Sequence, residues 1–78
     1  MIKAYVLVVT NPGETKNVYR AAKATPGVVE IHEVMGPYDI VIEIEVGSLS
    51  EVPPILSDKI RGIPGIESTT SLVTFPEA

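Results

Sequence analysis

The chain has 78 residues, a hydrophobic content of 45%, a formal net charge of −4 and no cysteine. This length fits one domain, which we expect to span residues 1–78. The acidic balance and the scattering of six Lys and Arg residues exclude the basic stripe of a protein that binds nucleic acid directly. The sequence shows no run long enough for a membrane span, no secretory signal, and no thiol for disulfides or thiolate metal sites. We therefore expect a cytoplasmic protein.

Alternating and helical hydrophobic patterns divide the chain into four strands and two helices, separated by turns rich in Gly and Pro. In chain order, the expected elements are a strand at Ile2–Val9, a helix at Glu14–Ala24, strands at Val28–Met35 and Tyr38–Val46, a helix at Ser50–Arg61 and a strand at Ile66–Phe75. The Pro53-Pro54 pair fits only the first turn of a helix, so the regular part of the second helix should begin near Pro53. The buried helix stripes are expected at Val18, Ala21, Ala22, Ile55, Leu56 and Ile60.

Two similar corners indicate that the chain is built from matching halves. Thr25-Pro26-Gly27 follows the first helix and Ile63-Pro64-Gly65 follows the second, each directly before a strand. Two βαβ halves with right-handed crossovers favour a ferredoxin-like α+β sandwich of βαββαβ order. In this fold a four-stranded antiparallel sheet carries both helices on one face.

The first strand is apolar on both sides, which poses a problem for such a sheet. Its two rows are Ile2, Ala4, Val6 and Val8 on one side and Tyr5, Leu7 and Val9 on the other. Two helices cover one face, and leaving the second row in water would forgo several kcal/mol at about 25 cal/mol per Å² of apolar area. A symmetric dimer that packs sheet on sheet is therefore expected.

The turn Gly36-Pro37-Tyr38-Asp39 leads into a strand in which Ile40, Ile42 and Ile44 alternate with Glu43 and Glu45. The glycine is free to adopt positive φ, the proline has a fixed φ, and the carboxylate lies where the strand begins. A turn shaped this specifically is typical of a place that holds a small molecule. Asp39 has a structural alternative, because Asp often accepts hydrogen bonds from turn amides.

Four consecutive hydroxyl residues, Ser68-Thr69-Thr70-Ser71, open the last strand. They fit ordinary strand propensity, and they also form a set of donors and acceptors without fixed charge. If Asp39 faces the same crevice, the carboxylate suits an ammonium group while the hydroxyls and loop amides suit a carboxyl group. The pair of segments then indicates an amino-acid ligand.

Two other sets of residues carry weaker alternatives. His32, the single histidine, could be a general base of a small dimeric sandwich enzyme, although no second residue is placed by the sequence to orient it. Glu43 and Glu45 could join Glu30 or Glu33 around a cation that prefers oxygen ligands, but such rows are usually the polar side of a strand. We expect no metal, no cofactor and no catalytic residue.

The chain resembles the ligand-binding domain of the Lrp/AsnC family of transcription regulators, also called the RAM domain. The resemblance covers essentially the whole chain. It rests on Val28-x-Glu30, on Gly36-x-Tyr38-Asp39 with its alternating strand, and on the corner Ile63-Pro64-Gly65-Ile66 that runs into Thr69-Thr70-Ser71. Met1 lies directly before the first strand, so the chain resembles a stand-alone version without the helix-turn-helix half.

The resemblance implies the ferredoxin-like fold, sheet-to-sheet dimers, and assembly of dimers into octamers or decamers. It also implies amino-acid binding at contacts between dimers, with ligand-binding residues that map onto Gly36, Pro37, Tyr38, Asp39, Thr69, Thr70 and Ser71. Leu72 departs from the pattern, since some relatives have an aromatic residue there.

The sequence thus predicts a non-catalytic, oligomeric module that senses an amino acid or related metabolite and regulates transcription or metabolism indirectly. Its expected partners are the effector, other copies of the chain, and full-length regulators of the same family. The alternatives are a small enzyme that uses His32 and a regulatory subunit of a metabolic enzyme.

Overall fold

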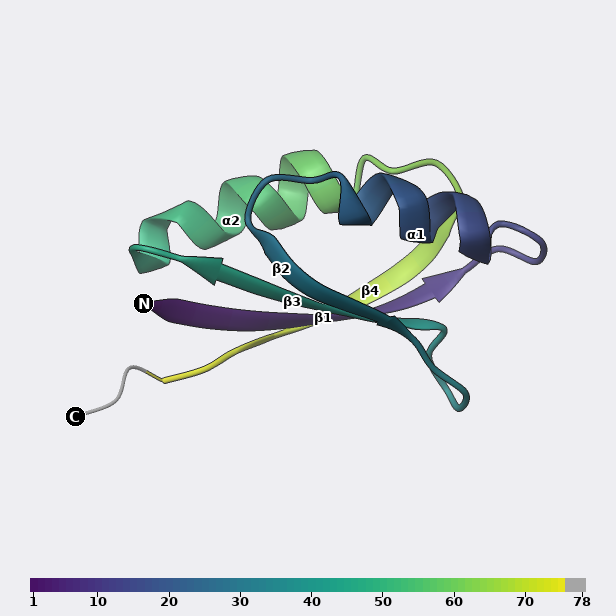
Figure 1. The fold of residues 1–78 in the computed structure, drawn as a ribbon, viewed down its shortest axis with the longest axis horizontal. Helices are drawn as coiled ribbons and strands as arrows, with labels where there is room; N and C mark the ends of the chain where they lie inside the picture. The colour runs from purple at the N-terminus through teal and green to yellow at the C-terminus, as the bar shows by residue number, and fades with distance from the viewer. Residues whose placement is uncertain (76–78) are drawn as a thin grey trace.

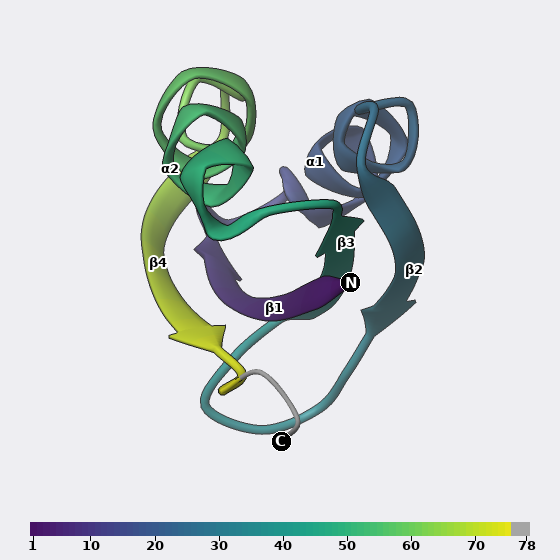
Figure 2. The ribbon, with the colours of Figure 1, turned by 90° about the vertical axis from the view of Figure 1, so that its left-hand side faces the viewer.

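The computed structural model describes residues 1–75 and has the predicted βαββαβ order (Figure 1). Its elements are β1 (Ile2–Thr10), α1 (Thr15–Lys23), β2 (Val28–Glu33), β3 (Ile40–Val46), a 3₁₀ turn η1 (Leu49–Glu51), α2 (Val52–Pro54), a wider π-helical segment η2 (Ile55–Ile60) and β4 (Ile66–Val73). All neighbouring strands are antiparallel, in the order β2-β3-β1-β4. Both helices lie on the same side of the sheet (Figure 2). The prediction of a ferredoxin-like α+β sandwich is confirmed.

The sheet has one covered face and one open face, and strand alternation creates both. On β1, Ala4, Val6 and Val8 are fully buried beneath the helices, while Tyr5, Leu7 and Val9 are half-buried on the other side. The covered core is completed by residues of β3, the helices and the last corner: Val18, Ala22, Ile40, Ile42, Ile44, Val46, Val52, Ile60 and Ile63. The predicted division of β1 into two rows is therefore confirmed.

The two Pro-Gly corners are equivalent in conformation and in packing. Gly27 and Gly65 have φ values of 96° and 99°. A Cβ at Gly27 would lie 2.9 Å from Ile55 of the second helix, and a Cβ at Gly65 would lie 2.8 Å from Glu14 beside the first. Each corner thus packs closely against the helix of the opposite half. The backbone conformation favours glycine at both positions, and at Gly65 the nearby Cβ of Glu14 also leaves no room for a side chain.

The first helix differs from the prediction at one position of its buried stripe. Val18 and Ala22 are buried as expected, but Ala21 is exposed. Ala21 adjoins the stripe without facing the sheet, because residues at i and i+4 lie on the same side of a helix and residues at i and i+3 diverge from it by part of a turn. The basic residues of this helix are exposed.

The second helix is less regular than predicted. Glu51 accepts a hydrogen bond of 2.7 Å from the amide of Ser48, and the Pro53-Pro54 pair occupies the first turn of α2 as expected. The amide of Arg61 then donates to the carbonyl of Leu56 at 3.1 Å, one residue further back than in an α-helix. The predicted stripe missed Val52, which is 2% exposed.

All four strands also differ in length from the prediction. β2 ends at Glu33 and β3 begins at Ile40, because the chain leaves the sheet between them, and Met35 is fully exposed. β1 continues to Thr10, while β4 ends at Val73 rather than Phe75. None of the helices within residues 1–75 has the length and apolar character needed to cross a membrane.

Candidate functional site

The turn between β2 and β3 projects beyond the sheet, away from the helices (Figure 1). Gly36 has a φ of 141°, and a Cβ built there would meet nothing within 4 Å. The backbone conformation, rather than a lack of space, therefore requires glycine at this position. Gly36 and Pro37 are exposed, whereas Tyr38 and Asp39 are half-buried where the turn rejoins the sheet.

Asp39 is tied to the end of β1. Its Oδ2 accepts hydrogen bonds from the amide of Thr10 at 2.9 Å and from the Thr10 hydroxyl at 3.3 Å. Its own amide donates to the carbonyl of Val8 at 2.8 Å. The Thr10 hydroxyl lies 2.7 Å from that of Thr15 at the start of α1. Asp39 thus has the structural role that the sequence left open. Its carboxylate joins the start of β3 to the end of β1, and the Thr10 hydroxyl extends this link to Thr15 of the first helix.

The row of hydroxyl residues is divided between the two faces of the sheet. Thr69 pairs with Val8 and Ser71 pairs with Val6, so both belong to the covered face. Thr70 pairs with Leu7 on the open face and is exposed. Successive side chains of a strand point to opposite faces, so Thr69, Thr70 and Ser71 do not form one continuous wall.

Ser71 has an unusual environment on the covered face. Its Oγ is buried and has no hydrogen-bond partner within residues 1–75. A buried hydroxyl without a partner lowers stability. This hydroxyl is directed under the helices, and it is not placed to meet a ligand that approaches the open face.

The two segments of the predicted site are the turn at residues 36–39 and the hydroxyl residues 69–71, and we call them the two walls. They lie at the same end of the sheet, on either side of β1. Val8 pairs with Ile40 of β3 on one side and with Thr69 of β4 on the other. Two strand spacings, about 10 Å, therefore separate the walls. Within one chain, β1 therefore lies between the two walls.

A depression of about 330 Å³ adjoins the hydroxyl strand. It is lined by Arg61, Ile66, Glu67, Ser68 and Thr69. Sequence reasoning missed Arg61, which ends the second helix and is brought beside β4 by the corner at Gly62–Gly65. The position of this arginine directly before the Gly62-Ile63-Pro64-Gly65 corner was the available signal.

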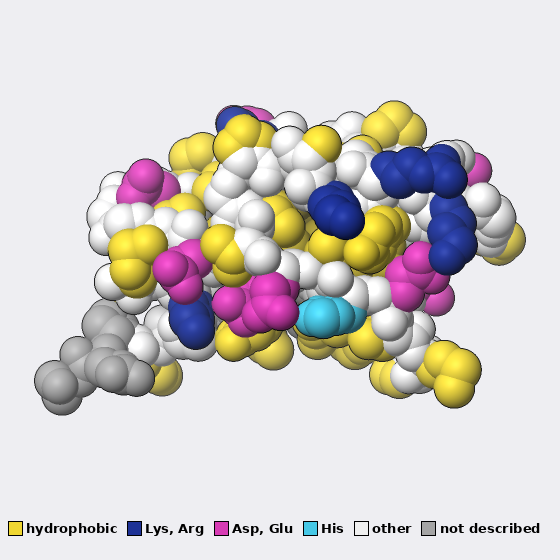
Figure 3. Space-filling view, viewed as in Figure 1, with side chains coloured by type: hydrophobic (Ala, Val, Ile, Leu, Met, Phe, Trp, Pro, Cys, Tyr) yellow, Lys and Arg dark blue, Asp and Glu magenta, His cyan; other side chains and the backbone are white. Residues whose placement is uncertain are grey.

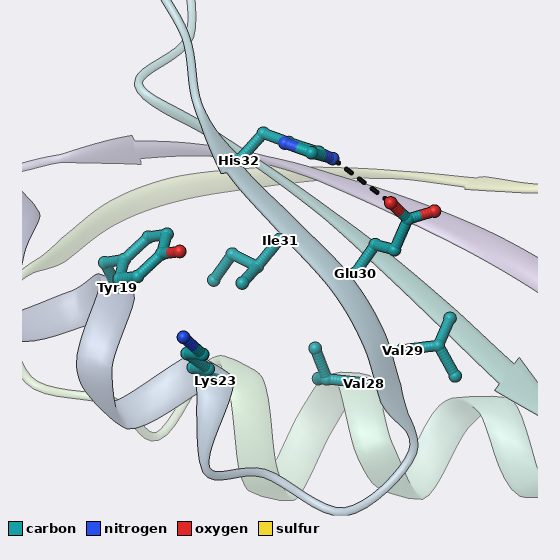
Figure 4. Close-up of a pocket in the computed structure, with 7 residues that line it drawn as sticks. All are labelled: Tyr19, Lys23, Val28, Val29, Glu30, Ile31 and His32. Carbon is teal, nitrogen blue, oxygen red and sulfur yellow. Dashed lines mark ion pairs between the residues drawn. The ribbon is translucent and has the colours of Figure 1, made fainter.

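A second depression, of about 240 Å³, lies between α1 and β2 (Figure 4). Its lining comprises Tyr19, Lys23 and residues 28–32. His32 lies 3.5 Å from Glu30 across an ion-pair contact, and both side chains are more than half exposed. An exposed pair of this kind does not orient or shield a general base, so the geometry does not favour the enzyme hypothesis.

The glutamate row lies on the open face, as strand alternation requires. Glu43 pairs with Glu30 on one side and with Tyr5 on the other, and Glu45 pairs with Lys3. Within residues 1–75, no three His, Asp or Glu side chains gather in a way that could hold a metal ion. The row therefore forms an acidic border beside the half-buried apolar residues of β1.

Comparison with known proteins identifies a domain family and several relatives of this chain. Residues 3–77 match the model of the Lrp/AsnC ligand binding domain. An uncharacterised HTH-type transcriptional regulator of Pyrococcus furiosus is 33% identical over 75 residues, covering 92% of this chain and 50% of the regulator. The homocitrate synthase of Sulfurisphaera tokodaii is 40% identical over 60 residues, covering 76% of this chain and 13% of the enzyme. The chain spans about half the length of the curated regulators it matches.

Solved structures have the same fold. The crystal structure of FFRP-DM1 has a TM-score of 0.90 and 31% identity, covering 96% of this chain and 100% of that one. A Thermus thermophilus protein, TTHA0845, has a TM-score of 0.92 and 28% identity, covering 100% of this chain and 98% of that one. The complex of a Neisseria meningitidis transcriptional regulator with L-Met has a TM-score of 0.83 at 13% identity, covering 97% of this chain and 51% of the regulator. The last similarity concerns the fold alone.

Proposed function

Because this chain belongs to the Lrp/AsnC ligand-binding domain family, we propose that it is a non-catalytic, oligomeric module that senses an amino acid or related metabolite at contacts between subunits. It would regulate transcription or metabolism indirectly, by changing its assembly or by joining full-length regulators of the same family. A cytoplasmic location is part of this proposal, and the transcription regulators among its relatives support it. The bound L-Met in the Neisseria meningitidis regulator supports the choice of ligand class.

The observation that carries the proposal is the separation of the two walls by β1. Asp39 and Tyr38 lie on one side of the strand end, and the hydroxyl strand lies on the other. Tyr38 and Asp39 are half-buried and Thr70 is exposed, so a second subunit could contact either wall. Of the predicted ligand-binding residues, we retain Gly36, Pro37, Tyr38, Asp39, Thr69 and Thr70, with Thr70 the more exposed of the two hydroxyl residues. Ser71 is not retained, because its hydroxyl is buried on the covered face.

The open face of the sheet supports oligomerisation. Tyr5, Leu7 and Val9 form a half-buried apolar row, and Leu72 on the adjacent strand is 52% exposed. Covering this row with the same row of a second copy would give an isologous, sheet-on-sheet dimer. Assembly of such dimers into octamers or decamers would then create the contacts at which the effector binds.

Calorimetric titration with each proteinogenic amino acid, combined with light scattering, tests the proposal. We expect heat with at least one amino acid and a change in mass or in the association constant. A tenfold change in association needs about 1.4 kcal/mol of differential binding, which a ligand at a subunit contact can supply. Thr70→Val should weaken binding, while Ser57→Ala, which removes an exposed hydroxyl from the second helix, serves as the control. No heat and no mass change with any amino acid would refute the proposal.

The similarity to homocitrate synthase favours one further candidate, a module that regulates a metabolic enzyme. The matched region covers 76% of this chain but 13% of the enzyme, so a domain of this kind can be attached to a much larger catalytic chain. Purification of the tagged protein from its native cells separates the two routes. An enzyme whose rate changes with the added module and effector would favour enzyme regulation, and a full-length regulator would favour control of transcription.

A further inference from the structure

The strand β2 has a free outer edge. It pairs with β3 on one side and is the first strand of the order β2-β3-β1-β4. The amide of Val34 donates to the carbonyl of Asp39 at 2.9 Å, toward β3. Since inward and outward backbone groups alternate along an antiparallel strand, the amides and carbonyls of Ile31 and Glu33 point away from the sheet. An edge of this kind is a template for an added strand.

The first helix turns this edge into a groove. Tyr19 and Lys23 of α1 face Val28 and Ile31 of β2 across the depression of about 240 Å³ (Figure 4). The Lys23 Nζ lies 5.8 Å from the centre of the Tyr19 ring, which holds the ammonium group at the groove. The groove therefore has an apolar floor, a backbone edge and a cation beside them.

The charge along the groove has one sign on the helix side. Lys16, Arg20 and Lys23 are exposed on α1, which contains no acidic residue within Thr15–Lys23. Figure 3 shows basic side chains above and to the right of the histidine, although the protein as a whole has a net charge of −4. Lys16 is neutralised by Glu33 at 2.9 Å, and no ion pair involves Arg20 or Lys23 within residues 1–75. Lys23, which lines the groove, and Arg20 on the same helix thus remain available to a partner, and the carboxylate in the lining is that of Glu30 on β2.

We propose that the groove between β2 and α1 binds an extended acidic segment of a partner protein, which adds to the sheet as a fifth strand beside β2. Backbone hydrogen bonds to Ile31 and Glu33 would supply affinity, and acidic side chains facing Arg20 and Lys23 would supply specificity. A second copy fits this edge less well, because pairing of two β2 strands would bring two basic α1 helices together. The site is distinct from the proposed effector site and does not depend on it.

Fluorescence anisotropy with a labelled peptide of alternating valine and glutamate tests the charge requirement. We expect saturable binding that weakens as salt is added, because exposed charges are screened. Lys23→Glu should weaken binding by about tenfold or more. The matched control is Lys59→Glu, the same charge change on the second helix, which should leave binding unchanged. If a peptide that alternates valine and lysine bound as tightly as the acidic peptide, the proposal would be overturned. It would also be overturned if Lys23→Glu and Lys59→Glu weakened binding of the acidic peptide equally.

Amide hydrogen exchange tests the position of the added strand. The Ile31 and Glu33 amides should exchange rapidly in the free protein and slow down when the peptide binds, whereas the inward amide of His32 should change little. Ile31→Pro removes an outward amide that an edge strand can spare, so it should abolish peptide binding while circular dichroism shows a retained fold. Protection at β4 instead of β2 would contradict the proposal. So would protection that increases with protein concentration alone, because a second copy would then cover the edge.

Discussion

The two faces of the sheet come from the same strands but differ in how complete they are. On the covered face, Ala4, Val6 and Val8 have no exposed surface and pack against the helices. On the open face, the intervening residues Tyr5 and Leu7 are apolar yet half-buried. A single chain therefore completes one hydrophobic layer and covers the other only in part. Changes on the covered face should affect folding, and changes on the open face should affect assembly.

The largest expected effect on stability comes from truncating a buried side chain on the covered face. Ile42→Ala removes a fully buried side chain, which should lower the free energy of unfolding by about 3 kcal/mol. Val41→Ala on the open face should cost less than about 1 kcal/mol in dilute, monomeric protein. Urea denaturation of both variants gives the comparison, and equal losses would break the distinction between the faces.

The next largest effect on stability is expected at Gly65, where the corner before β4 packs against Glu14 beside the first helix. Gly65→Ala places a Cβ 2.8 Å from that of Glu14 in a backbone with φ of 99°. Gly13→Ala is the matched control, since φ is 81° there and nothing lies within 4 Å. Both variants share the conformational penalty, so the clash should make Gly65→Ala about 1–2 kcal/mol more destabilising in thermal unfolding. Indistinguishable melting temperatures would contradict the close packing of this corner.

A smaller effect is expected at the link between the turn and the end of β1. Asp39→Asn keeps the shape of the side chain but replaces the charged acceptor of the Thr10 amide, at a cost of about 1 kcal/mol. Asp58→Asn, on the exposed side of the second helix, should cost nothing measurable. Chemical denaturation separates the two variants. If Asp39→Asn abolishes effector binding without loss of stability, Asp39 acts on the ligand rather than on the fold.

The smallest effect should be seen at Ser71. Its Oγ is buried without a partner within residues 1–75, so Ser71→Ala should leave stability unchanged or raise it by up to about 1 kcal/mol. Thr70→Val on the open face should give no such gain, because that hydroxyl is exposed to water. A clear loss of stability in Ser71→Ala would show that the hydroxyl has a partner after all.

Much of the fold was predictable because local patterns determine it. The period of two along β1 and β3 predicted both faces, and the similar Pro-Gly corners predicted two matching halves. The prediction was wrong about Ala21 and Val52, where small shifts in helix phase decide which side chain is buried. The irregular course of the second helix could not be predicted either, because no local sequence pattern indicates the hydrogen bond from the Arg61 amide to the Leu56 carbonyl.

The candidate site was less predictable, for two different reasons. The bond from Thr10 to Asp39 spans 29 positions, so no local pattern could assign the carboxylate to it. Arg61 was missed for a different reason, since it comes to line the same depression as Ser68 only when the corner at residues 62–65 folds back. The division of Thr69, Thr70 and Ser71 between two faces was predictable, because strand alternation alone requires it.

The most direct test of the account combines assembly with ligand binding in one variant. Leu7→Glu places a charge in the half-buried row of the open face and leaves the covered core intact. Light scattering should show an oligomer for the original protein and a folded monomer for the variant. Calorimetry with the effector amino acid should then show that the monomer has lost binding, because the two walls would no longer be completed by a neighbour. A folded monomer that binds with undiminished affinity would contradict a site shared between subunits.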